Sequence, residues 1–254
     1  MNFTLLAVAV AVGLFLAVLA CLEAGRRIGA TAQKKDEKDS GASAVDAAVY
    51  GLLGLLIAFT FSGAATRFEA RRHLIVEEAN DIGTAYLRLD LLSAEARKSL
   101  QDKFRLYVDL RLEVYRNVSD IAGTKAALAR SAAIQSEIWT EAVAASRAIL
   151  PQPAAMLLLP ALNQMIDITT TRTVAGQNHP PSIVFVMLIG LALLSALLAG
   201  YSMAGSRSGI HMLVFAAILS ITVFVILDLE YPRLGLIRID AADHVLVEVR
   251  QGMK

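Results

Sequence analysis

Four apolar stretches, each about 20 residues long, limit the possible folds of this chain more than any other feature. They cover residues 3–22, 45–65, 182–204 and 211–229. A helix needs roughly 20 apolar residues to cross about 30 Å of hydrocarbon, so each stretch can span a bilayer. A mean hydropathy of +0.56 agrees. We therefore predict an all-α membrane protein with four transmembrane helices and both termini on one side.

The first stretch has two other interpretations, a cleaved signal peptide and a lipoprotein signal that would place a lipid on Cys21. Both need a basic segment in front of the apolar run, but only Met1 and Asn2 precede it. We therefore expect a retained span. Gly25 and Gly29 follow it at G-x-x-x-G spacing. Because two arginines lie between them, we expect a turn or helix end rather than a dimerisation face.

The chain between the second and third spans is polar, with 14 basic and 13 acidic residues between Arg67 and Pro180. We divide the chain into a transmembrane hairpin (1–66), a helical cytoplasmic region (67–180), a second hairpin (181–230) and a C-terminal tail (231–254). Basic residues near the membrane are evenly divided between the two sides. The clustering of Arg67, Arg71 and Arg72 at one exit favours cytoplasmic termini in a plasma or inner membrane.

Apolar residues in the polar region repeat with helical spacing. Phe68, Ile75, Ile82 and Leu89 recur every seven residues, which predicts that the second span continues into water as one helix. We predict further helices over about 93–118, 125–149 and 154–173, with a break at 121–124 and a kink at Pro160. In the helix over 93–118, one face is shared by Leu100, Phe104, Tyr107, Val108, Val114 and Val118. The apolar tract 156–162 is too short to span and should be buried between helices or subunits.

Composition excludes several classes of function. A net charge of +1 does not provide the basic field that nucleic acid needs. The single Cys21 allows no intrachain disulfide, and the histidines are too scattered for a metal site: His73, His179, His211 and His244. With no phosphate loop and no G-x-S-x-G, we expect neither an enzyme nor a cofactor.

The second span is rich in small residues interleaved with bulky apolar ones. Gly51, Gly54 and Ala58 alternate with Leu55 and Phe59. Such a helix can pack closely against other helices, or several copies can line a pore. The composition leaves both possibilities open.

Four segments carry a family resemblance: FTFSGAATRFEARR (59–72) with EEANDIGTA (77–85), LNQMID (162–167) with Arg172, NHPP (178–181), and ILDLEYPRLG (226–235). Together they make the chain similar to the bestrophin-like family of bacterial membrane proteins, and remotely to bestrophin anion channels. The resemblance extends over residues 45–240.

This resemblance implies a homo-oligomeric ring, commonly a pentamer, in which the second-span helices line an axial pathway for chloride or other small anions. Alignment on Arg67 places Leu55 and Phe59 in an apolar pore neck, with Gly51 or Leu52 as the third position. Hydrophobic constrictions of this kind gate by dewetting. Arg67, Arg71 and Arg72 would attract anions near the neck, and a polar stripe of Glu77, Asp81, Thr84 and Arg88 could face a vestibule.

Alternatives stay open. Acids close to the arginines also allow a cation channel of the same fold, and a non-conducting scaffold or regulator could share it. The dense acidic run of calcium-gated relatives is missing, so calcium gating is not carried over. The cluster Arg71, His73, Glu77 and Asp81 is better explained as a solvated helix face than as an active site. Asp46 and Asp228, at span edges, should reach water.

Overall fold

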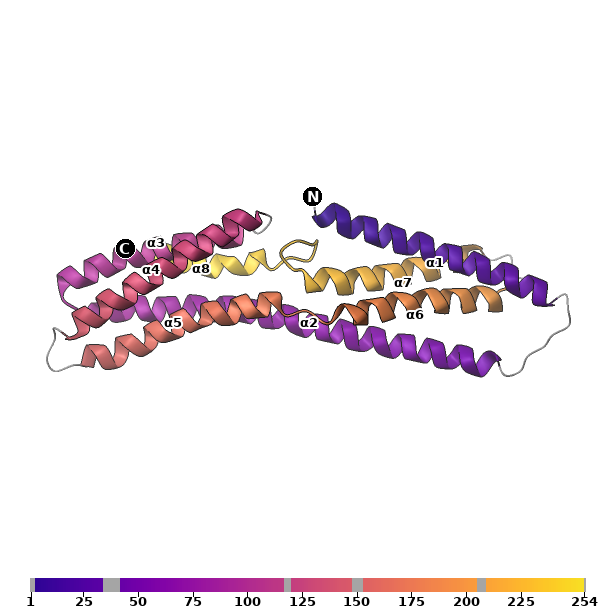
Figure 1. The fold of residues 1–254 in the computed structure, drawn as a ribbon, viewed down its shortest axis with the longest axis horizontal. Coiled ribbons are helices and arrows are strands. Elements are labelled where there is room, and N and C mark those ends of the chain that lie inside the picture. Colours follow the sequence, from indigo (N-terminus) through magenta and orange to yellow (C-terminus); the bar gives the residue numbers. More distant parts are fainter. Residues whose placement is uncertain (1–2, 34–41, 117–119, 148–152, 205–208, 254) are drawn as a thin grey trace. The chain divides into compact units, whose positions relative to one another are not determined.

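The computed structural model describes residues 3–33, 42–116, 120–147, 153–204 and 209–253. Within these residues every regular element is helical, which confirms the predicted fold class (Figure 1). In chain order the elements are α1 (Phe3–Gln33), α2 (Ala42–Arg88), η1 (Leu89–Leu91), α3 (Ala94–Arg116), α4 (Ile121–Arg147), α5 (Pro153–Gln177), α6 (Ser182–Ser202), α7 (Gly209–Glu230), η2 (Asp240–Asp243) and α8 (His244–Gly252).

The described residues contain four helical segments that are long and apolar enough to cross a membrane. They are Val8–Ala32, Ser43–Leu91, Ala155–Ser202 and Gly209–Glu230, and each of them overlaps one of the four predicted spans. The protein is therefore a multi-pass membrane protein by length and composition. The third segment takes in α5 as well as α6, which are separate helices.

Helix α1 continues well past the apolar stretch, to Gln33. Glu23 explains the extension, because it accepts hydrogen bonds from Arg26 Nε at 2.8 Å and from Arg27 Nε at 2.7 Å, one turn away. Such pairs stabilise an exposed helix. The expectation that Gly25 and Gly29 mark a turn is therefore wrong, since both lie inside α1.

The chain forms two compact units, and the first comprises Met1–Arg67 and His179–Ile237. Here α1 packs against α6 and α7 (Figure 1). The contact with α6 is made by backbone. A Cβ added at Gly25 would lie 1.9 Å from the Leu197 carbonyl oxygen, and one at Gly200 would lie 2.0 Å from the Leu22 carbonyl oxygen. The glycines are needed because no side chain fits between these helices.

The second unit comprises Phe68–Asn178 and Arg238–Lys254. Residues 240–252, expected to belong to a tail, form η2 and α8, and α8 packs against α3. The heptad prediction is confirmed: Ile75 and Ile82 of α2 and Leu89 of η1 are fully buried in the core of this unit, and Phe68 packs against it. Helix continuity from the second span into this region is likewise confirmed.

Helix α3 buries the face predicted for it, including Leu100, Phe104 and Tyr107, and its N-terminus is capped by the Ser93 side chain. The predicted member Val118 lies outside the described residues. Helix α4 begins at Ile121, where a break was expected.

Local hydrogen bonding accounts for this early start of α4. Asp120 Oδ1 accepts a hydrogen bond from Gly123 N at 3.0 Å, as an N-cap does. The cap satisfies a donor of the first turn, so the segment 121–124 is helical rather than broken.

Helix α5 contains Pro160 and continues to Gln177, so the proline does not end it. The apolar tract inside α5 has two different sides. Leu158 and Leu162 are buried, whereas Met156 is 79% exposed and Leu157 is 48% exposed. Within the chain itself, the tract is therefore buried on one side only.

Candidate functional site

The membrane part of α2 leaves one face uncovered. Leu52, Leu55 and Phe59 are 50%, 52% and 67% exposed, and their spacing puts them on one side of the helix. Gly51 is exposed beside them, with open space where a Cβ would stand. Other residues of α2, such as Ala64, are buried. The four residues predicted for a pore neck are thus available to something outside the chain.

Arg67, at the end of this part of α2, has a carboxylate partner on α7. Its Nε donates to Glu230 Oε1 at 2.9 Å, and Glu230 is only 1% exposed. Glu230 also lies 3.4 Å from His179 Nδ1, and the His179 ring stacks on Tyr231 with centroids 4.7 Å apart. The positive charge of Arg67 is therefore compensated inside the first unit.

The turn after α7 is built on Asp228. Its carboxylate accepts hydrogen bonds from Leu236 N at 2.9 Å and Ile237 N at 2.6 Å, and Asp228 is 2% exposed. A Cβ at Gly235 would lie 2.0 Å from Asp228 Oδ1, so the turn has no room for a side chain there. The expectation that Asp228 reaches water is wrong, because its acceptor capacity is used by the backbone.

Arg71 is buried and bonds to backbone. Its Nε donates to the Ala175 carbonyl and its Nη2 to the Asn178 carbonyl, both at 3.0 Å. These carbonyls lie at the C-terminal end of α5, where the helix dipole favours a cation. The interpretation of a solvated face containing Arg71 is therefore wrong for this residue, although His73 and Glu77 are exposed as expected.

The other residues predicted for a vestibule lie mostly on the surface of the chain. Arg72 is exposed and pairs with Glu69 at 2.9 Å. Thr84 is exposed, and Arg88 donates to the Leu157 carbonyl. Asp81 is partly buried; among the described residues, no ion pair forms with it or with Glu77.

A buried charged cluster in the second unit was not predicted. Glu78 of α2 is fully buried and accepts a hydrogen bond from Arg111 Nε of α3 at 2.6 Å. Tyr115 Oη donates to Glu78 Oε2 at 3.0 Å, and Arg172 Nη1 of α5 donates to the same oxygen. Arg172 also stacks over the Tyr115 ring, with its Cζ 4.1 Å from the centroid. We call these four residues the Glu78 cluster.

One signal in the sequence could have identified this cluster. Glu78 lies between Ile75 and Ile82 at spacings of three and four, on the buried face of α2. Arg111 likewise falls on the buried face of α3. A charged residue inside an apolar stripe needs a buried partner. Burial raises the pKa of Tyr115, so its hydroxyl stays protonated and can donate to Glu78.

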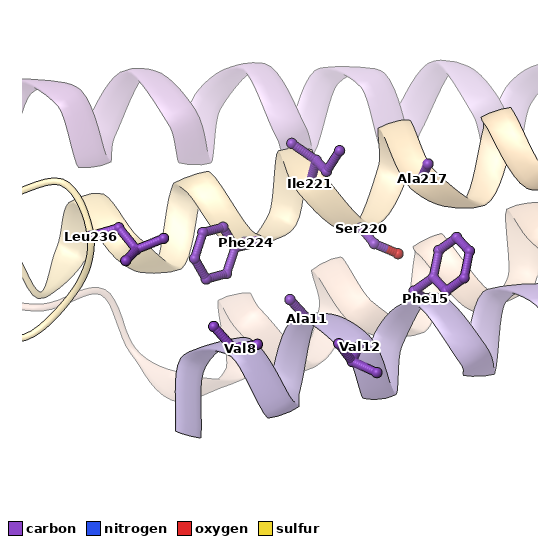
Figure 2. Close-up of a pocket in the computed structure, with 9 residues that line it drawn as sticks. All are labelled: Val8, Ala11, Val12, Phe15, Ala217, Ser220, Ile221, Phe224 and Leu236. Carbon is purple, nitrogen blue, oxygen red and sulfur yellow. The ribbon is translucent and has the colours of Figure 1, made fainter. Parts of the chain in front are cut away.

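A groove with a cavity volume of about 320 Å³ lies between α1 and α7 (Figure 2). Its lining is apolar apart from one serine: Val8, Ala11, Val12, Phe15, Ala217, Ser220, Ile221, Phe224 and Leu236. The buried Ser220 hydroxyl has no hydrogen-bond partner in the part of the chain that the structure describes. None of the residues that line the groove is titratable. Nor do the described residues contain a cluster of potential metal ligands.

Four membrane-spanning helices with a large helical region between the second and third define a class, the α-helical multi-pass membrane proteins. Within that class, the pattern of the bestrophin-like domain matches residues 6–243, nearly the whole chain. The chain belongs to the bestrophin-like family. None of the curated proteins and none of the solved structures compared with the chain matches it. Membership suggests an anion-channel type of function rather than an enzyme, in an oligomeric membrane assembly.

Proposed function

We propose that the protein is a homo-oligomeric ion channel in the plasma or inner membrane, with cytoplasmic termini. Copies of α2 surround an axis, and Leu55 and Phe59 form an apolar neck with Gly51 or Leu52 as its third level. The family suggests chloride or other small anions as the permeant ions and a pentamer as the assembly. The observation that carries the proposal is the uncovered apolar face of α2, on which Phe59 is 67% exposed.

An uncovered apolar face could also contact lipid, but α2 has features that favour an axis. The small Gly51 and Gly54 have open space around them, which allows helices of neighbouring copies to approach closely. A ring of Phe59 side chains would then narrow the pathway and gate it by dewetting. A helix that only contacts lipid needs neither glycines that allow close helix packing nor a ring of Phe59 side chains.

A cation channel of the same architecture is the second candidate. The charges on α2 favour it, because Arg67 and Arg71 have partners within the chain and Arg72 pairs with Glu69. Glu77 and Asp81 form no ion pair among the described residues. The sign of the permeant ion therefore depends on which of these charges faces the pathway.

Ion flux in liposomes tests the proposal. Purified protein should release a trapped salt gradient, and Phe59→Ala should change the rate because it removes the ring that narrows the neck. Phe61→Ala is the matched control, since Phe61 is 45% exposed on the opposite side of α2 and should leave the rate unchanged. No flux from well-folded protein would favour the non-conducting scaffold.

The reversal potential in a KCl gradient then identifies the ion. A potential near the chloride equilibrium supports the anion channel. A potential near the potassium equilibrium that collapses in a Glu77→Gln, Asp81→Asn double variant supports the cation channel. Native mass measurement of the purified particle gives the number of subunits, and a monomer would contradict the proposal.

A further inference from the structure

The Glu78 cluster contains more positive than negative charge. One carboxylate, Glu78, faces two guanidinium groups, whose side chains are 3% exposed in Arg111 and 8% exposed in Arg172. Tyr115 contributes a neutral hydroxyl, and the surrounding core of this unit is apolar. A buried charge is costly unless an opposite charge or hydrogen bonds compensate it. The cluster therefore lacks one negative charge.

Two arginines of α2, the half-buried Arg67 and the buried Arg71, are compensated. Arg67 has Glu230, and Arg71 has the carbonyls at the end of α5, where the helix dipole is negative. Arg172 lies inside α5, before those carbonyls, and must share Glu78 with Arg111. The residues of the cluster come from α2, α3 and α5, and among the described residues Glu78 is the one carboxylate that pairs with Arg111 or Arg172.

The two arginines also keep unused donors. Arg111 uses Nε and Nη2, and Arg172 uses Nη1, whereas Arg111 Nη1 and both Nε and Nη2 of Arg172 have no acceptor in the described part of the chain. The Arg172 side chain keeps 8% of its surface exposed to solvent. The fully buried side-chain atoms without a partner among the described residues are three serine hydroxyls. A small anion from solvent can therefore reach the free donors.

We propose that the Arg111 and Arg172 guanidinium groups bind a small inorganic anion such as chloride, which completes the charge balance of the Glu78 cluster. The site lies in the second unit, outside the membrane spans, and does not depend on the channel proposal. Its role is to stabilise the packing of α2, α3 and α5, because the anion neutralises the charge that remains after Glu78 is shared. The planar guanidinium group of Arg172 can donate charge-assisted hydrogen bonds to such an anion.

Thermal unfolding of the full chain in nanodiscs tests the site. Sodium chloride replaces sodium gluconate at constant ionic strength, and the fluorescence of Trp139, which packs against the core of the second unit, reports unfolding. The unfolding temperature should rise with chloride along a saturable curve. A wild-type unfolding temperature that is independent of chloride would overturn the proposal, whatever the flux experiment shows.

Arg172→Gln should abolish the chloride dependence. Arg97→Gln is the matched control, because Arg97 is exposed and pairs with Asp90 at 3.5 Å, so its variant should keep the wild-type curve. If Arg172→Gln lacks helical circular dichroism, Arg172→Lys keeps the charge and loses the fork. That variant should raise the half-saturating chloride concentration by about tenfold.

A carboxylate from a neighbouring copy could supply the missing charge instead. In that case Arg172→Gln would reduce the subunit number seen by native mass measurement, and chloride would not change the unfolding temperature of the wild type. That result would overturn the anion site while leaving the channel proposal intact.

Discussion

Replacing Gly25 by alanine should separate α1 from α6. The new Cβ would lie 1.9 Å from the Leu197 carbonyl oxygen and 2.8 Å from Tyr201 N, whereas ordinary contact begins at 3.4 Å. Both neighbours are backbone atoms, which cannot rotate away, so the helices must move apart locally by about 1.5 Å to restore contact distance. Overpacking of this kind costs about 1–3 kcal/mol. The higher helix propensity of alanine offsets up to about 1 kcal/mol.

Gly13→Ala on the same helix is the control, because a Cβ at Gly13 meets nothing within 4 Å. It has the same propensity gain without the clash, so it should be as stable as the wild type or more stable by up to about 1 kcal/mol. Titration with SDS in mixed micelles, followed by far-UV circular dichroism, measures both variants. Equal stability of Gly25→Ala and Gly13→Ala would refute the close backbone contact.

Two further substitutions test buried carboxylates by thermal unfolding. Glu78→Gln removes the one carboxylate that pairs with two buried guanidinium groups and should cost about 3–5 kcal/mol, while the exposed Glu77→Gln should stay within about 0.5 kcal/mol. Similar losses in both would contradict the buried cluster. Asp228→Ala leaves the amides of Leu236 and Ile237 without their acceptor and should cost about 1–3 kcal/mol for each unsatisfied group. An unchanged unfolding temperature would show that this carboxylate does not hold the turn.

The spans could be predicted because hydrocarbon imposes a length and an apolar composition that are local properties of the sequence. The continuity of α2 was also predictable, since Ile75, Ile82 and Leu89 keep one helical period beyond the membrane. The packing of Gly25 on α6 was not. Arg26 and Arg27 suggested a membrane exit, but their pairing with Glu23 lets the helix continue past them.

The charged partners were the least predictable part, because each ion pair joins residues far apart in the chain. Arg67, Arg71 and Glu78 are charged residues on one stretch of α2. The neighbouring sequence does not show their partners. Arg67 pairs with a carboxylate on α7, Arg71 bonds to the C-terminal end of α5, and Glu78 pairs with an arginine of α3. The pore-neck residues remain a prediction, since a single chain does not reveal what covers them.

The bond between Arg67 and Glu230 restricts the rotation of α2. Arg67 lies eight residues beyond Phe59, which is about 12 Å along a helix. A turn of α2 about its own axis would swing the Phe59 ring, but it would also pull the guanidinium away from a carboxylate that is only 1% exposed. The ion pair with α7 therefore opposes rotation of α2 about its axis and fixes the direction in which its exposed apolar face points.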